Sequence, residues 1–243
     1  MQSFLIALQF LTSLPVRLDR MPEPQAVGRS LLYYPLVGLL LGAMLWLVGA
    51  VFENASAPLL AALLLTGWVA LTGGLHLDGL ADSADAWLGG FGDRERTLTI
   101  MKDPRSGPIA VVVLVLLLLL KFVALWTLLA ADQRLALLLA PLLGRSALLG
   151  LFLTTPYVRP GGLGQVLAEQ MPRNTSRIVL GGVVLVCLIL GSSGWLALAA
   201  TVGVGWLSRR AMCRRIGGTT GDTAGALLEL VECAVLVVLA LGL

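Results

Sequence analysis

The segment from His76 to Asp85 contains the residues whose types and spacing are most suggestive of chemistry. Asp78, Asp82 and Asp85 stand at positions i, i+4 and i+7, a spacing that places three carboxylates on one face of a helix. Like charges repel in this arrangement, and a bound divalent cation would relieve the repulsion. Mg²⁺ prefers oxygen ligands and typically takes one or two carboxylates together with substrate phosphates. A solvated acidic face is the alternative, but charged residues make up only 13% of this chain.

A second acidic group lies near the C-terminal end of the chain. Asp222 and Glu229 are seven residues apart and share a helix face, whereas Glu232 faces another direction and is a weaker candidate. Glycines around Asp222 would allow either a phosphate or a neighbouring helix to come close. The resulting prediction is a metal site built from both acidic groups: Asp78, Asp82, Asp85, Asp222 and Glu229, with Gly218 and Gly221 admitting phosphate.

Basic residues and one histidine complete the candidate site. Lys102 and Arg105, three residues apart beside glycine and proline, are suited to holding a pyrophosphate, although a positive anchor at the membrane surface has the same composition. His76, the only histidine, is a candidate proton acceptor or phosphate ligand, and Asp82 and Asp85 are the other catalytic candidates. Lys121 lies inside an apolar stretch, where it is expected to snorkel or to pair with an acid.

The composition predicts an all-α protein of the membrane. Hydrophobic residues make up 58% of the 243 positions, and only helices and closed barrels satisfy backbone groups within lipid. Residues 1–16 are predicted to form a short interfacial or re-entrant helix. Seven spans of a helical bundle follow, near residues 30–52, 57–73, 107–131, 134–155, 178–192, 195–208 and 225–243.

The placement of basic residues predicts the orientation of these spans. Seven crossings put nearly all arginines on one side, and only Arg134 lies in the opposite loops. The positive-inside rule makes the basic side cytoplasmic, with the N-terminus inside. The net charge of +3 then reflects topology and does not indicate nucleic-acid binding. We therefore expect one integral membrane domain, residues 1–243, with its active site at the cytoplasmic end and residues 156–177 forming a surface loop or a lid.

These features together predict phosphoryl transfer at a membrane surface. Such catalysis depends mostly on positioning and on charge neutralisation. Two alternatives remain open. A CDP-alcohol phosphotransferase of phospholipid synthesis also uses aspartates on membrane helices, but the later glycine and aspartates of its pattern are missing here. An ion-coupled transporter would place carboxylates at the bilayer midplane on several spans.

Four stretches of the chain resemble the cobalamin synthase family, adenosylcobinamide-GDP ribazoletransferase. They are the segments from Phe4 to Val16, from Gly73 to Asp85, from Ile100 to Gly107, and from Gly217 to Glu229. They span nearly the whole chain, and the second is the most specific. Pro104 stands where the family more often has serine, a departure that leaves the acidic positions untouched.

The resemblance implies a multi-pass enzyme of the bacterial inner membrane that requires Mg²⁺. It would join adenosylcobinamide-GDP to α-ribazole, or to α-ribazole 5′-phosphate, and release GMP. Asp85 or His76 would take the proton, and Lys102 and Arg105 would neutralise phosphate oxygens. The number of metal ions, the accepted lower bases and the oligomeric state, a homo-oligomer included, stay open.

Overall fold

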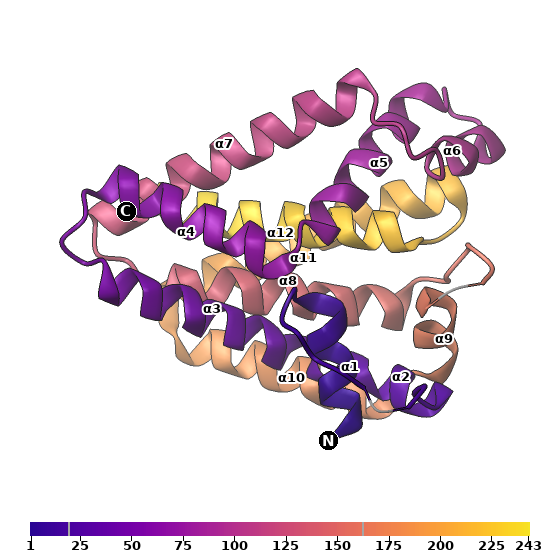
Figure 1. The fold of residues 1–243 in the computed structure, drawn as a ribbon, viewed down its shortest axis with the longest axis horizontal. Coiled ribbons are helices and arrows are strands. Elements are labelled where there is room, and N and C mark those ends of the chain that lie inside the picture. The colour runs from indigo at the N-terminus through magenta and orange to yellow at the C-terminus, as the bar shows by residue number, and fades with distance from the viewer. Residues whose placement is uncertain (19, 162) are drawn as a thin grey trace.

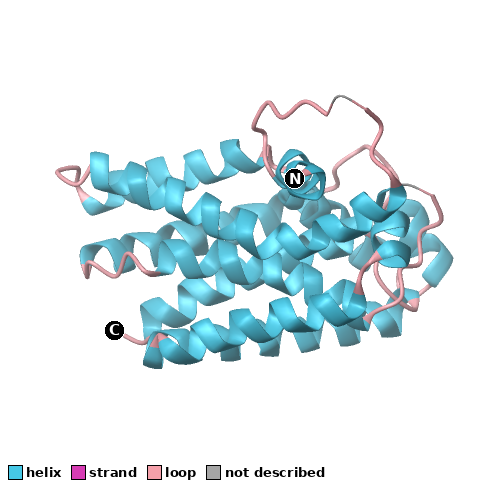
Figure 2. Cartoon of the chain, turned by 90° about the horizontal axis from the view of Figure 1, so that it is seen from below, coloured by secondary structure: helices cyan, strands magenta, loops and turns pink. Residues whose placement is uncertain are grey.

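The computed structural model describes residues 1–18, 20–161 and 163–243, and the secondary structure in these ranges is helical (Figures 1 and 2). One isolated parallel bridge joins Tyr157 to Thr219. The α-helices are α1 (Gln2–Leu11), α2 (Pro24–Ser30), α3 (Tyr34–Val51), α4 (Ala57–Thr72), α5 (Leu75–Gly89), α6 (Arg94–Ile100), α7 (Pro108–Ala130), α8 (Ala136–Thr154), α9 (Leu163–Gln170), α10 (Arg173–Ile189), α11 (Gly191–Ile216) and α12 (Gly221–Leu241).

The predicted helical bundle is confirmed, and its spans can now be counted more closely. Each of the seven predicted ranges coincides with a helix, and α1 is the predicted short apolar helix. Four helical segments are long and apolar enough to cross a membrane alone, and two bent helix pairs raise the number to six. Helix α11 spans 26 residues but is not among these six, because glycines, serines and a basic last turn dilute its apolar character.

The second predicted span is interrupted by a sharp bend. Helix α4 ends at Gly73 and α5 begins after Gly74, with φ values of 64° and 70° that favour glycine. The two helices meet at an angle of 87°. The prediction treated residues 57–73 as a complete span, whereas α4 and α5 together form one broken span or a re-entrant element. The bend turns the acidic helix α5 toward α12 (Figure 1).

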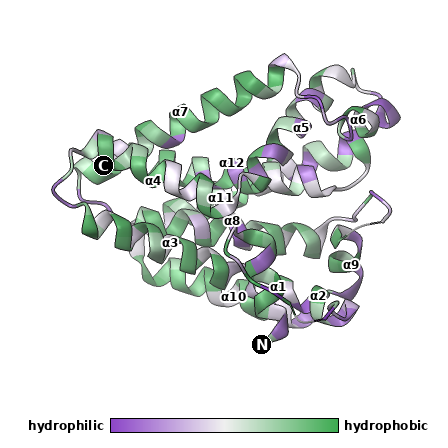
Figure 3. Cartoon of the chain, in the orientation of Figure 1, coloured by the Kyte–Doolittle hydropathy of each residue, from purple (hydrophilic) through white to green (hydrophobic). Residues whose placement is uncertain are grey.

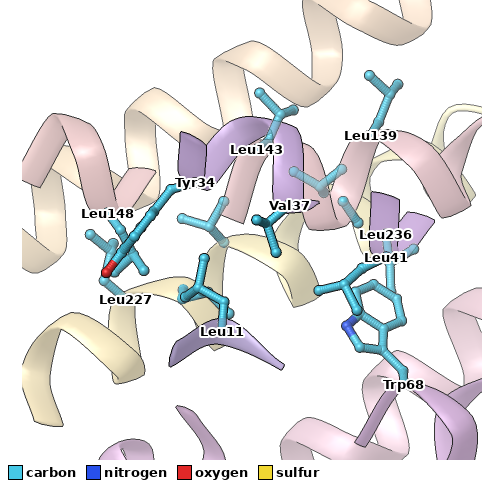
Figure 4. Packing of buried hydrophobic residues seen from close by; sticks show 14 of the residues in the cluster. Leu11, Tyr34, Val37, Leu41, Trp68, Leu139, Leu143, Leu148, Leu227 and Leu236 are labelled. Carbon is cyan, nitrogen blue, oxygen red and sulfur yellow. The ribbon is translucent and has the colours of Figure 1, made fainter. Parts of the chain in front are cut away.

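The closest packing in the core joins α3 to α8. Gly38 and Gly42 stand four residues apart on α3, and a Cβ at Gly42 would lie 2.6 Å from the Leu137 carbonyl oxygen. Small residues at this spacing let two helix backbones approach closely in a membrane protein. Leucines and Val37 fill the space around this contact, and Trp68 of α4 closes one side (Figure 4). This core is the rigid frame behind the polar end of the bundle.

Much of the outer surface is apolar, as expected for contact with lipid. On α7, only 28% of the most apolar window is buried inside the protein, and the helix is apolar around most of its circumference (Figure 3). Its exposed large side chains are Val111, Val112, Val115, Leu116, Leu119, Leu120, Val123 and Trp126. This surface supports the membrane assignment independently of sequence periodicity.

Arginines join the helix ends at the polar end of the bundle. Arg94 donates to the Ile216 carbonyl at 3.0 Å, Arg209 to the Thr154 carbonyl at 2.9 Å, and Arg173 to the Leu153 carbonyl at 2.6 Å. These bonds satisfy carbonyl groups that helix ends leave without partners. Arg134, by contrast, pairs with Asp132 in the turn between α7 and α8. The basic segments that charge placement assigned to one side therefore do meet at one end.

The described part of the segment predicted as a loop or lid, residues 156–161 and 163–177, contains more helix than expected. It contains α9 and the first turns of α10, which meet at an angle of 92°. Val158 donates to the Thr219 carbonyl and Thr219 donates to the Pro156 carbonyl, both at 2.9 Å. These two bonds fasten the segment after α8 to the turn that precedes α12.

Candidate active site

The two predicted acidic groups meet where α5 crosses α12, and glycines make the crossing possible. A Cβ at Gly79 would lie 2.8 Å from the Asp222 carbonyl oxygen, and one at Gly225 would lie 3.3 Å from the Cα atom of His76. Larger residues at either position would push the helices apart. The glycines around Asp222 were expected to admit either a phosphate or a neighbouring helix. At Gly225 the neighbouring helix, α5, fills the space.

A cavity of about 150 Å³ opens beside this crossing and is lined by Asp78 and His76 of α5 and by Asp222 of α12. Asp78 is exposed, whereas His76 is buried, with only 4% of its surface exposed. Neither ring nitrogen of His76 has a hydrogen-bond partner within the described residues. Carboxylates from sequence positions more than 140 residues apart thus share one cavity with a buried imidazole.

Asp222 is held by an ion pair that sequence reasoning did not identify. Arg159, in the segment fastened to the turn before α12, lies 2.5 Å from Asp222 through its Nη2 atom. Thr220 caps α12 and exchanges hydrogen bonds with Thr223 in a capping box. The carboxylate therefore sits in the first turn of α12, where the helix dipole favours negative charge, with a guanidinium beside it.

The two glycines proposed to admit phosphate have different surroundings. Gly218 is buried against the segment after α8, and a Cβ there would collide with the Pro156 carbonyl. Gly221 is exposed, lines the cavity, and would find only the Tyr157 hydroxyl, at 4.0 Å from an added Cβ. Gly218 is therefore a packing residue, and only Gly221 leaves room for a ligand.

The three aspartates of α5 share one helix, as predicted, but differ in their contacts. Asp82 is half-buried and is near enough to Asp78, Asp222 and Asp85 to experience their charge, and also that of Arg159. Asp85 instead accepts hydrogen bonds from the backbone N–H groups of Gly107 at 2.5 Å and Ala110 at 3.0 Å. Both Asp85 oxygens thus cap α7, whereas in the part of the chain that the structure describes no such bond is made to Asp82.

The basic segment lies beside a second cavity of about 380 Å³ that Asp85 and Arg105 both line. Arg105 is exposed and pairs with Asp103 through Nε at 2.9 Å and Nη2 at 2.6 Å. These bonds lower the pKa of Asp103 to about 2, so the acid stays ionised at neutral pH. Lys102 is exposed, with no ion-pair partner among the described residues. It is the freer cation of the two.

Glu229 does not join the acidic site. Its carboxylate lies 2.6 Å from the Lys121 Nζ atom, and Glu232 lies 2.7 Å from the same atom. Arg145 of α8 pairs with Glu232, and both side chains are fully buried. These four residues form a neutral cluster in the core, which we call the buried quartet. The proposal of Glu229 as a metal ligand is therefore unfavourable, because a lysine occupies the position a cation would take; the expectation that Lys121 pairs with an acid is confirmed.

No group of three or more His, Cys, Asp or Glu side chains among the described residues is close enough to hold a metal ion unaided. The donor set that remains at the crossing is Asp78, Asp82 and Asp222. Such a set fits Mg²⁺, which needs only one or two carboxylates when substrate phosphates supply further oxygens. Of the five predicted ligands, Asp85 and Glu229 have partners within the protein, and the assignment of metal ligands stays a prediction.

Comparison with known proteins identifies the family. A model of the family described as cobalamin-5-phosphate synthase matches residues 3–240. The chain belongs to the cobalamin-5-phosphate synthase family. An adenosylcobinamide-GDP ribazoletransferase of Stutzerimonas stutzeri strain A1501 is 69% identical over 241 residues, which cover 99% of this chain and 98% of the relative.

Relatives of the same name occur in other bacteria. That of Pseudomonas putida strain KT2440 is 69% identical over 243 residues, all of both chains. That of Pseudomonas fluorescens strain Pf0-1 is 64% identical over 237 residues, 97% of this chain and 98% of the relative. No solved structure matches the chain.

Sequence reasoning overlooked two parts of this family member's site. Arg159 was noted only as a topological charge, and no pattern near it indicated that it would pair with Asp222. Tyr34, which lines the cavity from α3, gave no signal because it lies within an apolar stretch. The only signal near Arg159 was the group Pro156, Pro160 and Gly161, which is typical of a turn. A turn fixes the path of the backbone but does not identify the partner of a side chain.

Proposed function

We propose that this chain transfers the adenosylcobinamide phosphoryl group from adenosylcobinamide-GDP to α-ribazole or α-ribazole 5′-phosphate. A ribose hydroxyl oxygen would form a bond to the phosphorus that carries cobinamide. The bond from that phosphorus to the bridging oxygen would break, and the bridging oxygen would leave with GMP. The observation that carries the proposal is the single cavity lined by Asp78 and Asp222 in a chain 69% identical to relatives named for this reaction.

Magnesium is the cofactor we propose for the three carboxylates at the crossing, Asp78, Asp82 and Asp222. When bound, Mg²⁺ neutralises charge that develops on phosphate oxygens in the transition state. A bound cation would also explain why α5 tolerates its acidic face next to α12, because repulsion among the three carboxylates would otherwise disfavour the arrangement. Asp85 positions this face by capping α7.

The remaining polar residues have separable tasks in the proposed reaction. His76 has two ring nitrogens without partners in the described residues and lines the cavity, so it can accept the proton of the attacking hydroxyl. Arg159 stands beside Asp222 and can donate a charge-assisted hydrogen bond to a phosphate oxygen. Lys102 is exposed near the second cavity and can neutralise the GMP side of the pyrophosphate.

The chemistry defines an assay for the function. Purified protein in detergent is given adenosylcobinamide-GDP and α-ribazole, and GMP and adenosylcobalamin are measured with Mg²⁺ and with chelator. We expect equal amounts of the two products, and no turnover once the metal is removed. Asp132→Asn, in the turn between α7 and α8, is the matched control and should retain activity. Absence of product with Mg²⁺ present would contradict the function, and full activity in chelator would contradict the cofactor.

We also propose that the site faces the cytoplasm of a bacterial inner membrane. The support is the gathering of arginines at one end of the bundle and the positive-inside rule. Cysteines placed at the exposed positions Ser106 and Ala211, in a background without native cysteines, should be labelled only after the inner membrane is opened. A cysteine at exposed Ala131 should be labelled in intact spheroplasts. Reversed labelling would overturn the orientation.

A further inference from the structure

The cavity beside the crossing changes in character from its rim to its interior. Asp78 is exposed and Asp222 partly exposed, so they mark the rim, whereas Leu148 and Phe152, which line the same cavity, are buried and mark its interior, with Phe10 partly buried beside them. The helices that supply these side chains, α1 and α8, both contribute buried residues to the main hydrophobic core. Two apolar aromatic rings and several aliphatic side chains make a poor environment for water alone, and they are suited to an apolar part of a ligand.

Tyr34 adds an unused donor to this interior. The residue is 1% exposed, lines the cavity, and has a hydroxyl without a hydrogen-bond partner in the described residues. Ser30, one turn earlier, lies close enough to act on the Tyr34 hydroxyl, but it donates its own hydroxyl to the Val27 carbonyl at 2.6 Å, and the Tyr34 hydroxyl meets no hydrogen-bond geometry within the described residues. Figure 4 shows the Tyr34 hydroxyl beside Leu148, at the α12 side of the core. A buried hydroxyl that lacks a partner is costly, so a ligand acceptor at this point would be stabilising.

Size and charge restrict what the cavity can hold. A volume of about 150 Å³ is enough for an aromatic ring, and the cavity beside the crossing has about this volume while remaining open at its polar rim. Two carboxylates at the rim disfavour a phosphate in the interior, because like charges would meet without water between them. A neutral aromatic ring that carries a hydrogen-bond acceptor satisfies both restrictions.

We propose that this cavity binds the aromatic base of the ribazole, with the Tyr34 hydroxyl donating to the ring nitrogen that carries no ribose. Leu148 and Phe152 then limit the size of the base. The ribose extends to the rim, where its hydroxyl meets His76 and the carboxylates of α5 and α12. The inference rests on the proposed function and adds to it the residues that select the base.

Substitution of Tyr34 by phenylalanine tests the hydrogen bond while keeping the ring. We measure the KM for α-ribazole and for adenosylcobinamide-GDP separately, and the thermal stabilisation of the protein by α-ribazole alone. Tyr34→Phe should raise the KM for α-ribazole about fivefold, the size of one neutral hydrogen bond. The KM for adenosylcobinamide-GDP should stay unchanged. Tyr33→Phe is the matched control, because Tyr33 packs against Phe4 and does not line the cavity.

A second substrate tests whether the Tyr34 hydroxyl acts through the acceptor nitrogen. It is a nucleoside whose base lacks that nitrogen, such as an indole riboside. Tyr34→Phe and the natural chain should use or bind it equally, because neither can form the bond. A fivefold effect of Tyr34→Phe on this riboside as well would show that the hydroxyl acts on packing and would overturn the inference. Equal KM values for α-ribazole in Tyr34→Phe and the natural chain would also overturn it.

The size limit supplies a second variant that does not depend on Tyr34. Leu148→Ala should improve kcat/KM about tenfold for a ribazole with a bulkier base relative to α-ribazole. Leu149→Ala, at a buried leucine that does not line the cavity, should leave that ratio unchanged. An equal ratio in both variants would contradict the assignment. Stabilisation by α-ribazole without turnover would instead reject the proposed function and leave the base site standing.

Discussion

Helix α12 carries two acidic regions with opposite solutions to the cost of charge in a membrane protein. Near its start, Asp222 shares a cavity with Asp78, and within the described residues Arg159 is the one ion-pair partner of the three carboxylates there. Two turns later, Glu229 and Glu232 are buried and matched by Lys121 and Arg145. The buried quartet is thus neutral, whereas the α5–α12 site keeps an excess of negative charge.

The difference between the matched quartet and the unmatched α5–α12 carboxylates indicates which acidic residues are available for catalysis. Buried ion pairs compensate their own desolvation only when every charge is matched, and the quartet meets that condition. Carboxylates that stay exposed or half-buried without enough cations of their own are available for an external one. Intramembrane acids alone would have suggested ion transport, but pairing within the quartet removes them from that role, and family membership favours transfer chemistry.

The largest effect is expected at Asp82, in the unmatched region. Asp82→Asn should lower kcat at least about 10³-fold, because it removes a ligand that stabilises charge in the transition state. Thermal stability in detergent should change little, since the Asp82 side chain forms no hydrogen bond or ion pair with the described residues that the substitution would break. If Asp82→Asn kept a tenth or more of the natural kcat at limiting Mg²⁺, Asp82 would be an ordinary surface acid. The assignment of chemistry to the unmatched carboxylates would then be contradicted.

The quartet should respond in the opposite way, through stability. Glu232→Gln leaves the buried Arg145 without its partner and should destabilise the protein by about 3–5 kcal/mol. Thermal unfolding in detergent measures the loss, and the double substitution Glu232→Leu with Arg145→Met should recover much of it. A stable Glu232→Gln protein without activity would instead show that the quartet takes part in the chemistry.

Substitution of Asp85 should affect both activity and stability, each less than the substitutions in the two regions do. Asp85→Ala removes the cap of α7 and should lower the stability by about 1–2 kcal/mol, with a partial loss of activity as α5 shifts. Asp85→Asn keeps one acceptor oxygen and should recover part of both. Loss of activity in Asp85→Asn as complete as in Asp82→Asn would show that Asp85 is also a metal ligand.

The smallest effect is expected in the basic segment, at the edge of the site. Lys102→Ala should raise the KM for adenosylcobinamide-GDP several-fold, because an exposed charged contact contributes up to about 1 kcal/mol. The KM for α-ribazole should stay unchanged. Arg105→Ala should do less, because Arg105 already pairs with Asp103. Unchanged constants in both variants would reduce the segment to an anchor on anionic headgroups.

The sequence predicted the helices and their polar end well, because both depend on local patterns. The aspartate spacing required a helix, and α5 has one; apolar runs located the bundle; and arginine counts brought the basic loops together. The bend between α4 and α5 was missed, although Gly73 and Gly74 stand at it, because their φ values depend on where α5 packs.

The sequence could not predict which side chains pair between different helices. Glu229 lies on the same face of α12 as Asp222 by its spacing, yet Lys121 of α7 binds it. Which neighbour fills that face depends on helix rotation and depth, and no periodicity encodes either. The same holds for Asp85, whose bonds to Gly107 and Ala110 join segments more than 20 residues apart.

The central claim is that α5 and α12 supply carboxylates to one catalytic site, and a double-mutant cycle tests it most directly. We compare kcat/KM of Asp78→Asn, Asp222→Asn and the double variant at saturating Mg²⁺, in protein shown to be folded. Residues that act as one unit are strongly non-additive, so the double variant should lose about as much activity as either single one. Losses that multiply in the double variant would contradict a shared site.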